Sequence, residues 1–272
     1  MMAIYVKALA SGSSGNALLV RAGDVALLID AGLPGRRLAA LLRSHNVRPG
    51  GLAGIMVSHE HADHVCGAAA LARLYRAPIV ANHVTLARIT ASPHVATSAL
   101  PTGATRCFGK LEVSTFPVPH DARDPVGFAL AYDGWRMCIA TDVGYDCPDL
   151  EPHIAAADLV VLEANHDVET LRTGSYPWPL KHRILGNGGH LSNDQAGRLL
   201  ERAFTRAPRR GRWVWLAHLS ADNNTPRKAH EQIALRLDLA GLLHQTDLSV
   251  ARRDVPSAEW HSSLLARQLA LF

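Results

Sequence analysis

The chemistry of this chain is indicated most clearly by a short segment in which potential metal ligands stand close together. Residues 58–64 read Ser-His-Glu-His-Ala-Asp-His and directly follow a short apolar run. His59 and His61 would lie on opposite sides of a helix, but a turning loop can direct both imidazoles at one point. Asp63 and His64 open a predicted helix, whose free N–H groups would favour an anionic substrate. The segment therefore predicts a metal site rather than a surface run of histidines.

Three further donors follow predicted strands, where a sheet could deliver them to one edge. They are His120, Asp142 and His218. Together with the first segment they give five imidazoles and two carboxylates, enough for two divalent ions with Asp142 free to bridge them. Two ions about 4 Å apart can lower the pKa of a shared water and clamp the attacking and leaving oxygens. The alternative for each residue taken alone is a hydrogen-bonded structural role.

The elements that must position these residues can be read from the hydrophobic pattern. Predicted strands span 4–9, 17–20, 25–29, 54–58, 78–81, 112–116, 127–132, 135–140, 159–163 and 213–217. Predicted helices span 34–45, 64–76, 83–90, 192–206 and 225–240, with Ser192 as a candidate N-cap. This distribution favours an α+β sandwich of two mainly antiparallel sheets packed face to face, with helices outside. No repeat or linker divides the chain, so residues 1–272 are expected to form one domain.

The composition is that of a globular protein without a membrane span. The chain has 272 residues, of which 48% are hydrophobic and 19% are charged. No apolar stretch approaches the roughly 20 residues that cross a bilayer, and the start of the chain lacks a signal-peptide pattern, so a cytoplasmic location is expected. The formal net charge of +4 is compatible with a polyanionic partner without requiring one. The four cysteines are scattered without a C-x-x-C pair, which argues against a disulfide framework or a thiolate zinc site.

The ordering of segment 58–64 with His120, Asp142 and His218 resembles the metallo-β-lactamase superfamily of binuclear hydrolases. The resemblance implies an αββα sandwich with the metals at one edge of the paired sheets. It also implies a set of ligands: His59, His61 and His120 for the first ion, Asp63, His64 and His218 for the second, and Asp142 as the bridge. The donor types suit zinc or manganese, and they also admit iron.

Further segments over most of the chain are similar to one branch of that superfamily, the bacterial WalJ (YycJ) proteins. The resemblance implies a metal-dependent DNA nuclease, expected to be a 5′ to 3′ exonuclease acting in DNA maintenance such as mismatch repair. The similar segments are 11–16 (SGSSGN), 28–32 (LIDAG), 120–122 (HDA), 124–127 (DPVG), 163–167 (EANHD), 174–186 (GSYPWPLKHRILG), 189–192 (GHLS) and 217–220 (AHLS) with Asn223 and Asn224.

A second pair of residues is suited to phosphodiester cleavage. Glu163 ends a predicted strand and His190 precedes a predicted helix, much like the Glu–His dyad of ribonuclease Z, which is thought to protonate the leaving oxygen. An alkoxide needs that proton, and a histidine whose pKa is raised by a carboxylate is a suitable acid. His166 is a second candidate for the same role. The structural alternative is that Glu163 caps a loop and His190 packs against Leu191.

The segment between these two residues could bind the substrate. Lys181 and Arg183 could contact phosphates, and Tyr176 and Trp178 could stack on bases at the mouth of the site. The alternative for the two aromatic residues, which stand in a proline-rich loop, is that they are packing anchors.

Two other classes of function remain open in the sequence. One is a hydrolase of the same fold acting on a thioester, a lactam or a small phosphodiester, which would need a compact pocket rather than a basic groove. Glu163, His190 and the basic run 181–183 argue against it, because a thiolate leaves without a proton. The other is a metal-bound regulatory module without turnover. No long insertion follows Asp142 like that of relatives with an inserted β-CASP domain, so the nucleic-acid preference stays open.

Overall fold

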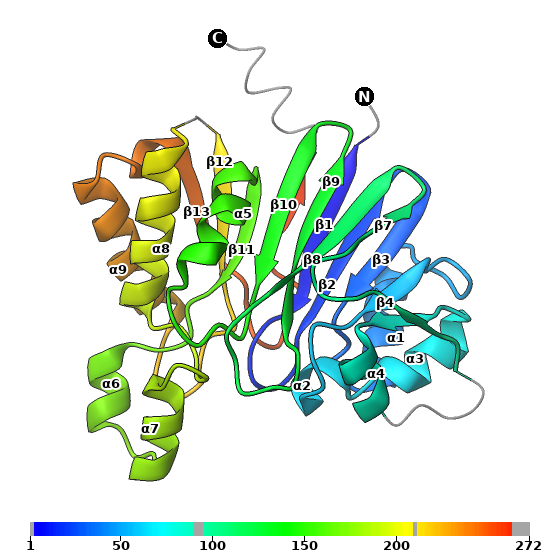
Figure 1. Cartoon of the computed structure of the whole chain (residues 1–272), viewed down its shortest axis with the longest axis horizontal. Coiled ribbons are helices and arrows are strands. Elements are labelled where there is room, and N and C mark those ends of the chain that lie inside the picture. Colours follow the sequence, from blue (N-terminus) through cyan, green and yellow to red (C-terminus); the bar gives the residue numbers. More distant parts are fainter. Residues whose placement is uncertain (1–2, 90–94, 209–210, 263–272) are drawn as a thin grey trace.

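Two seven-stranded sheets form the centre of the molecule (Figure 1). The computed structural model describes residues 3–89, 95–208 and 211–262. The first sheet has the order β14 (Glu259–His261), β1 (Ile4–Ala10), β2 (Ala17–Ala22), β3 (Val25–Ile29), β4 (Gly54–Met56), β5 (Ile79–Ala81) and β6 (Thr97–Ala99). The second has the order β13 (Thr246–Val250), β12 (Arg212–Ala217), β11 (Leu159–Glu163), β10 (Trp135–Ala140), β9 (Val126–Tyr132), β8 (Leu111–Pro117) and β7 (Thr105–Phe108).

Each sheet is half antiparallel and half parallel. In the first sheet the pairs from β14 to β3 are antiparallel and those from β3 to β6 are parallel. In the second, the pairs from β7 to β10 are antiparallel and those from β10 to β13 are parallel. The predicted sandwich is confirmed, but the sheets are mixed rather than mainly antiparallel. Because parallel strands share one direction, the ends of β4, β10, β11 and β12 open on loops where a site can form.

Helices cover both outer faces of the sandwich (Figure 1). The helices are α1 (Gly35–Ser44), α2 (Ala62–Val65), α3 (Ala68–Tyr75), α4 (His83–Arg88), α5 (Glu151–Ala156), α6 (Val168–Thr173), α7 (Trp178–Leu185), α8 (Asn193–Arg206) and α9 (Pro226–Leu239). Helices α1 and α3 pack on the first sheet, whereas α5, α8 and α9 pack on the second. Helices α6 and α7 project from the lower edge of the sandwich in Figure 1. No helix within the described ranges is both long and apolar enough to span a bilayer.

The main core lies between the two sheets, where alternate residues of both sheets face each other. Trp215 and Trp260 each expose 1% of their surface there, and Phe128 packs in the same cluster. Truncating a large buried side chain of this kind to alanine typically costs about 3–5 kcal/mol. This core fixes the strands whose ends carry the candidate ligands.

The structure confirms the start of one predicted helix and divides another into two helices. The predicted N-cap of α8 is confirmed, because Ser192 accepts a hydrogen bond from the backbone N–H of Gln195 in a full capping box. The predicted helix 64–76 is wrong as one element, because it is split into α2 and α3 at Gly67. A Cβ on Gly67 would lie 2.2 Å from the carbonyl oxygen of Leu33, so this close contact requires glycine at the break between the two helices. With only four residues, α2 provides no helix N-terminus for an anion.

Candidate metal centre

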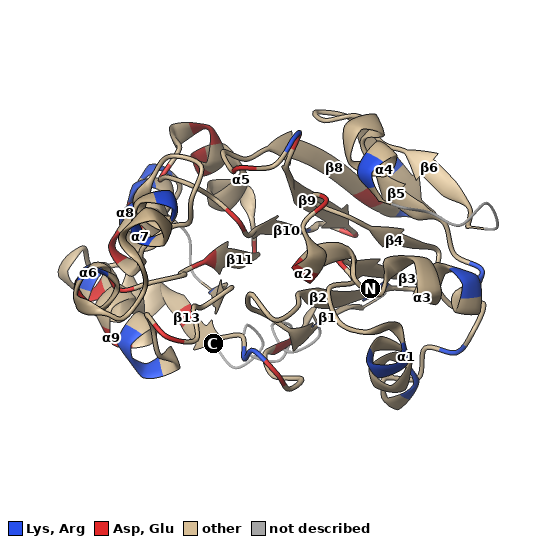
Figure 2. Cartoon of the chain, turned by 90° about the horizontal axis from the view of Figure 1, so that it is seen from below, with Lys and Arg blue, Asp and Glu red and all other residues tan. Residues whose placement is uncertain are grey.

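The predicted ligands come together at one edge of the sandwich, near α2 in Figure 1. The loop after β4 carries the first histidines, and Asp142 and His218 follow β10 and β12. Seen from this side, Figure 2 shows acidic residues at α2 and at the end of β11, with lysine and arginine on the surrounding helices α1, α4, α8 and α9. The strand ends thus bring these side chains to one edge of the sandwich, as the sequence predicted.

Three histidines form a first group of candidate ligands. His59 Nε2 lies 3.1 Å from His61 Nδ1, which lies 3.4 Å from His120 Nε2. His120 donates its Nδ1–H to the carbonyl oxygen of Gly189 at 2.9 Å, which leaves Nε2 as the ligand atom. Nitrogens bound about 2.1 Å from a tetrahedral zinc would lie about 3.4 Å apart. The distances from His61 Nδ1 to the other two nitrogens are therefore close to those between ligands of one tetrahedral metal ion.

A second group lies next to the first. His64 Nε2 is 3.5 Å from Asp63 Oδ2, and His218 Nε2 is 3.4 Å from the same oxygen. Asp142 stands between the groups, because its Oδ2 is 3.0 Å from His64 Nε2 while its Oδ1 is 3.7 Å from His120 Nε2. One carboxylate oxygen thus faces each group. This is the geometry that a bridging ligand requires, and it supports the predicted ligand sharing.

Asp30, which the sequence reading did not include in the site, supports one of the candidate ligands. Its Oδ2 accepts the Nδ1–H of His64 at 2.8 Å, and its Oδ1 accepts the backbone N–H of Ser58 at 2.8 Å. A carboxylate behind a histidine fixes the tautomer in which Nε2 is free to bind a metal. The only sequence signal for Asp30 was its place at the end of a strand within the similar segment 28–32.

The backbone around the centre is strained at the ends of three strands. Asp30, Asp142 and His218 have φ values of 58°, 58° and 54°, in the left-handed region that is uncommon for residues other than glycine. Strain of this kind costs roughly 1–3 kcal/mol for each residue and is concentrated at functional sites. A close backbone contact adds to this, because a Cβ on Gly32 would lie 1.6 Å from the carbonyl oxygen of Asp63. Gly32 therefore lets the loop after β3 hold the loop that carries the histidines.

Glu163 and His190 form the predicted dyad. His190 Nδ1 lies 2.9 Å from Glu163 Oε1, and His218 Nδ1 lies 2.7 Å from the same oxygen. The other oxygen, Oε2, accepts the backbone N–H groups of Val143 and Leu191 at 2.8 and 3.0 Å. Glu163 is fully buried and connects the candidate metal group to His190. Glu163 thus binds the backbone of two loops, as the structural alternative expected, and it also orients two imidazoles.

His166, the second candidate proton donor, differs from His190 in its surroundings. It exposes 1% of its surface, and neither ring nitrogen has a hydrogen-bond partner within the described part of the chain. Burial lowers the pKa of His166 to about 4, so its imidazole is neutral near pH 7. The pKa of His190 is raised, because the charge and hydrogen bond of Glu163 outweigh the opposing effect of burial. Of these two histidines, only His190 is in surroundings that favour the protonated form required of a general acid.

The electrostatics of the centre favour a cation. Burial would raise the pKa of Glu163, but the neighbouring His190 and His218 lower it to about 2. Burial likewise opposes the charged form of His218, yet Asp142, Asp63 and Glu163 raise its pKa to about 10. Asp142 Oδ2 is buried and lies 3.0 Å from His64 Nε2, without forming a hydrogen bond to a described residue. A cluster of ionised carboxylates with an unsatisfied oxygen fits divalent ions well.

Comparisons with known proteins agree with this centre. Residues 26–209 match the family described as beta-lactamase superfamily domain. An exodeoxyribonuclease YycJ of Bacillus anthracis is 36% identical over 261 residues, covering 90% of this chain and 96% of that protein. An exodeoxyribonuclease WalJ of Streptococcus pneumoniae is 36% identical over 248 residues, which cover 89% of each chain. The chain belongs to the WalJ (YycJ) family of the β-lactamase superfamily.

The predicted membership in the WalJ family is thus confirmed, and solved structures agree on the fold. The metallo-β-lactamase fold protein YhfI of Bacillus subtilis superposes with a TM-score of 0.73 at 16% identity, covering 96% of this chain and all of that one. At that identity the likeness concerns the fold alone.

In this WalJ-family chain, α7 carries three of the predicted substrate residues and the segment between α6 and α7 carries the fourth, Tyr176. The prediction for one of them needs correction. Lys181 is buried, and its Nζ donates to the carbonyl oxygens of Arg172 and Gly174 at 2.8 and 2.7 Å. Its charge joins the end of α6 to α7 and is not presented to a phosphate. The sequence could not show this, because a lysine beside a histidine and an arginine in a short helix has the pattern of an exposed basic cluster.

The other three predicted substrate residues remain accessible. Arg183 exposes 58% of its side chain and donates its Nε–H to Asp121 Oδ2 at 2.5 Å, next to His120. Trp178 is 62% exposed, and its ring meets that of His182 edge-on at 5.0 Å. Tyr176 donates its hydroxyl to Asp222 Oδ2 at 2.7 Å, in the loop after His218. The packing alternative therefore fits Tyr176 better than Trp178.

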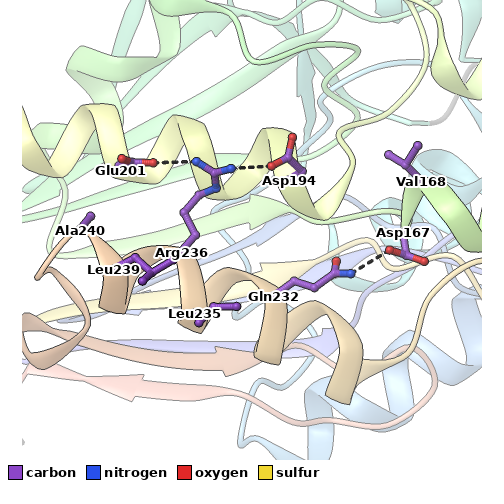
Figure 3. Close-up of a pocket in the computed structure, with 9 residues that line it drawn as sticks. All are labelled: Asp167, Val168, Asp194, Glu201, Gln232, Leu235, Arg236, Leu239 and Ala240. Atoms are coloured by element: carbon purple, nitrogen blue, oxygen red, sulfur yellow. Dashed lines mark hydrogen bonds and ion pairs between the residues drawn. The ribbon is translucent and has the colours of Figure 1, made fainter.

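A pocket of about 460 Å³ lies between α8 and α9, away from these residues (Figure 3). Arg236 spans it, with its guanidinium paired to Glu201 at 2.9 Å and to Asp194 at 2.7 Å. None of the candidate ligands lines this pocket. Each of its three carboxylates has a basic partner, Arg236 or Lys228, so the pocket is not a candidate for the chemistry of the centre.

Proposed function

We propose that this protein is a DNA exonuclease that uses two divalent metal ions to hydrolyse phosphodiester bonds in the 5′ to 3′ direction. The observation that carries the proposal is the hydrogen bond of Glu163 to His190, directly beside the two groups of candidate ligands. A nuclease must protonate an alkoxide leaving group, whereas a thioesterase releases a thiolate that needs no proton. We further propose a cytoplasmic location and a role in DNA maintenance.

The metal ligands follow from the two groups and the carboxylate between them. His59, His61 and His120 would hold one ion, and Asp63, His64 and His218 the other, with Asp142 binding both. Zinc and manganese suit this donor set, and iron is also compatible with it. When bound, the two ions would supply Lewis acidity that activates a water molecule and offsets the negative charge of the phosphate.

The residues of the chain itself position and move the proton. Glu163 accepts the Nδ1–H of both His190 and His218, so the Nε2 atom of each ring points away from that carboxylate. The protonated imidazole of His190 can then donate its Nε2 proton to the oxygen that leaves when the phosphorus–oxygen bond breaks. Asp63 contributes to catalysis here through the ion that it would hold with His64 and His218. His166, with its lowered pKa, is not the donor in this proposal.

The substrate is supported by two independent observations. Arg183 stands at the rim of the centre beside His120 and can exchange its pairing with Asp121 for a backbone phosphate. Trp178 offers an exposed ring on the projecting helix α7, where an unpaired base could stack. The WalJ-family relatives are named exodeoxyribonucleases, which favours DNA over RNA.

The test is cleavage of DNA and RNA labelled at the 5′ or the 3′ end, in single-stranded and duplex form, by the metal-reconstituted protein. Stepwise shortening of DNA from the 5′ end, absent in the Asp63→Ala variant, is the expected result. Shortening from the 3′ end would show that the enzyme degrades DNA in the 3′ to 5′ direction instead. Hydrolysis of a thioester or a small diester without any cleavage of nucleic acid would replace the proposal with a small-molecule hydrolase of the same fold.

A further inference from the structure

A pocket lined by apolar and charged residues opens beside the candidate centre, on the side of His218. Its volume is about 360 Å³, and it is lined by Ser11 and by residues of the segments 219–226 and 251–255. Ser11 joins the pocket to the centre, because its Oγ accepts the backbone N–H of His218 at 2.8 Å. The pocket therefore begins at the loop that holds a candidate metal ligand.

The charged groups of this pocket suit an anion. Arg252 is exposed and forms no ion pair with any residue that the structure describes. Arg253 donates its Nη2–H to the carbonyl oxygen of Leu219 at 2.6 Å, which places a second guanidinium against the loop after His218. Asp254 also lines the pocket, and its carboxylate accepts the hydroxyl of Ser14 at 3.3 Å. Two arginines against one aspartate leave one excess positive charge among the residues that line the pocket.

The position of the pocket relates it to the path of a long substrate. Arg183 lies beside His120, in the first group of candidate ligands, whereas Arg252 and Arg253 lie beyond His218, in the second group. A strand that crosses the centre between the two groups would thus meet an arginine on either side. Guanidinium groups bind phosphate oxygens well, because their N–H donors form a planar fork.

We propose that the pocket at Arg252 binds a backbone phosphate of the nucleic-acid strand, beyond the nucleotide whose bond is hydrolysed. The inference rests on the proposed nuclease function and adds a second anchor to it. A small diester held at the centre would not reach this anchor, so the pocket makes the enzyme prefer polymeric substrates. Arg252 binds substrate here and takes no part in proton transfer.

The experiment measures binding and turnover separately, with the manganese-reconstituted protein. Binding is measured with a fluorescent single-stranded oligonucleotide that has phosphorothioate linkages, over a range of salt concentrations. Turnover is compared between an ordinary oligonucleotide and bis(p-nitrophenyl) phosphate. The variants are Arg252→Ala, Arg252→Lys and, as a matched control, Arg48→Ala, since Arg48 is also exposed but lies in the loop between α1 and β4.

Arg252→Ala is expected to weaken oligonucleotide binding about tenfold, the size of one charged hydrogen-bonded contact. It should also reduce the slope of log affinity against log salt by about 0.7, the value for one phosphate of a single strand. The ratio of kcat/KM for the oligonucleotide to that for the small diester should fall similarly, with partial recovery in Arg252→Lys.

Two results would overturn the proposal that this pocket binds a backbone phosphate. One is an Arg252→Ala variant that binds like Arg48→Ala, and the other is an equal loss of turnover on both substrates. Failure of the proposed function looks different, because the wild-type protein would then bind the oligonucleotide without cleaving it. In that case a tenfold difference between Arg252→Ala and Arg48→Ala would still establish a phosphate site.

Discussion

Glu163 Oε1 lies 2.9 Å from His190 Nδ1 at the base of the candidate centre. The same oxygen lies 2.7 Å from Nδ1 of His218, so one buried carboxylate orients both a candidate proton donor and a candidate metal ligand. In the proposed mechanism, proton donation and metal binding are therefore coupled through Glu163. Variants of His190 and Glu163 should separate the two effects.

His190→Ala should lower kcat on DNA by about 10²–10⁴-fold, the usual contribution of a general acid. Metal content should stay the same, because His190 is not among the proposed ligands. The loss should be much smaller with bis(p-nitrophenyl) phosphate, since p-nitrophenolate leaves without a proton. Rates on both substrates and metal analysis of the purified variant make the test, with His83→Ala on exposed α4 as control. Equal losses on both substrates would refute the role of His190 as an acid.

Glu163→Gln should affect metal binding as well as turnover. The glutamine amide would direct an NH₂ group at N–H donors, because Glu163 accepts hydrogen bonds from Val143 and Leu191 as well as from two imidazoles. We expect the free energy of unfolding, measured in urea, to fall by about 1–3 kcal/mol, the cost of leaving a buried polar group unpaired. Chelator titration should show weaker metal binding than in His190→Ala. Metal affinity equal to that of the wild-type protein would contradict the coupling through Glu163.

Asp30→Asn should weaken metal binding without touching a proposed ligand. The substitution keeps the shape of the side chain but removes the charge that fixes the tautomer of His64. Losses of a carboxylate behind a metal-binding histidine are typically about 10–100-fold in affinity. Competition with a chromophoric chelator measures the change, and Asp24→Asn in the exposed turn between β2 and β3 is the control. If both variants bind metal equally, Asp30 has only a structural role.

The sequence predicted much of this centre because its donors stand at the ends of apolar strands. The strands containing Met56, Val161 and Trp215 have continuous hydrophobic runs, and the sequence predicted each of them to within two residues at either end. The strands β6, β7, β13 and β14 were not predicted, because β6, β7 and β14 are short, β6 and β7 have few apolar residues, and β13 is only partly buried. Periodicity gives no signal for such strands. Asp30 was missed for a different reason, since its partner His64 is 34 residues away and only the folded sheet brings them together.

The short helices α5, α6 and α7 were also missed, because helices of six to eight residues show less than the periodicity of a longer helix. The consequence was largest at Lys181. Within the basic run 181–183, the sequence showed no partner for this lysine, so phosphate binding was the natural interpretation. In the folded chain, its ammonium group closes the turn between α6 and α7.

Lys181→Met should therefore loosen the projecting helices rather than remove a phosphate contact. Methionine keeps the apolar stem but leaves the carbonyl oxygens of Arg172 and Gly174 without their donor. Hydrogen exchange in residues 168–185 should become faster, and KM for DNA should rise with little change in the dependence of binding on salt. Arg183→Ala should do the opposite, with unchanged exchange in α6 and a salt slope reduced by about 0.7. A reduced salt slope in Lys181→Met with normal exchange would restore Lys181 as a phosphate ligand, because a contact to phosphate is the interaction that added salt weakens.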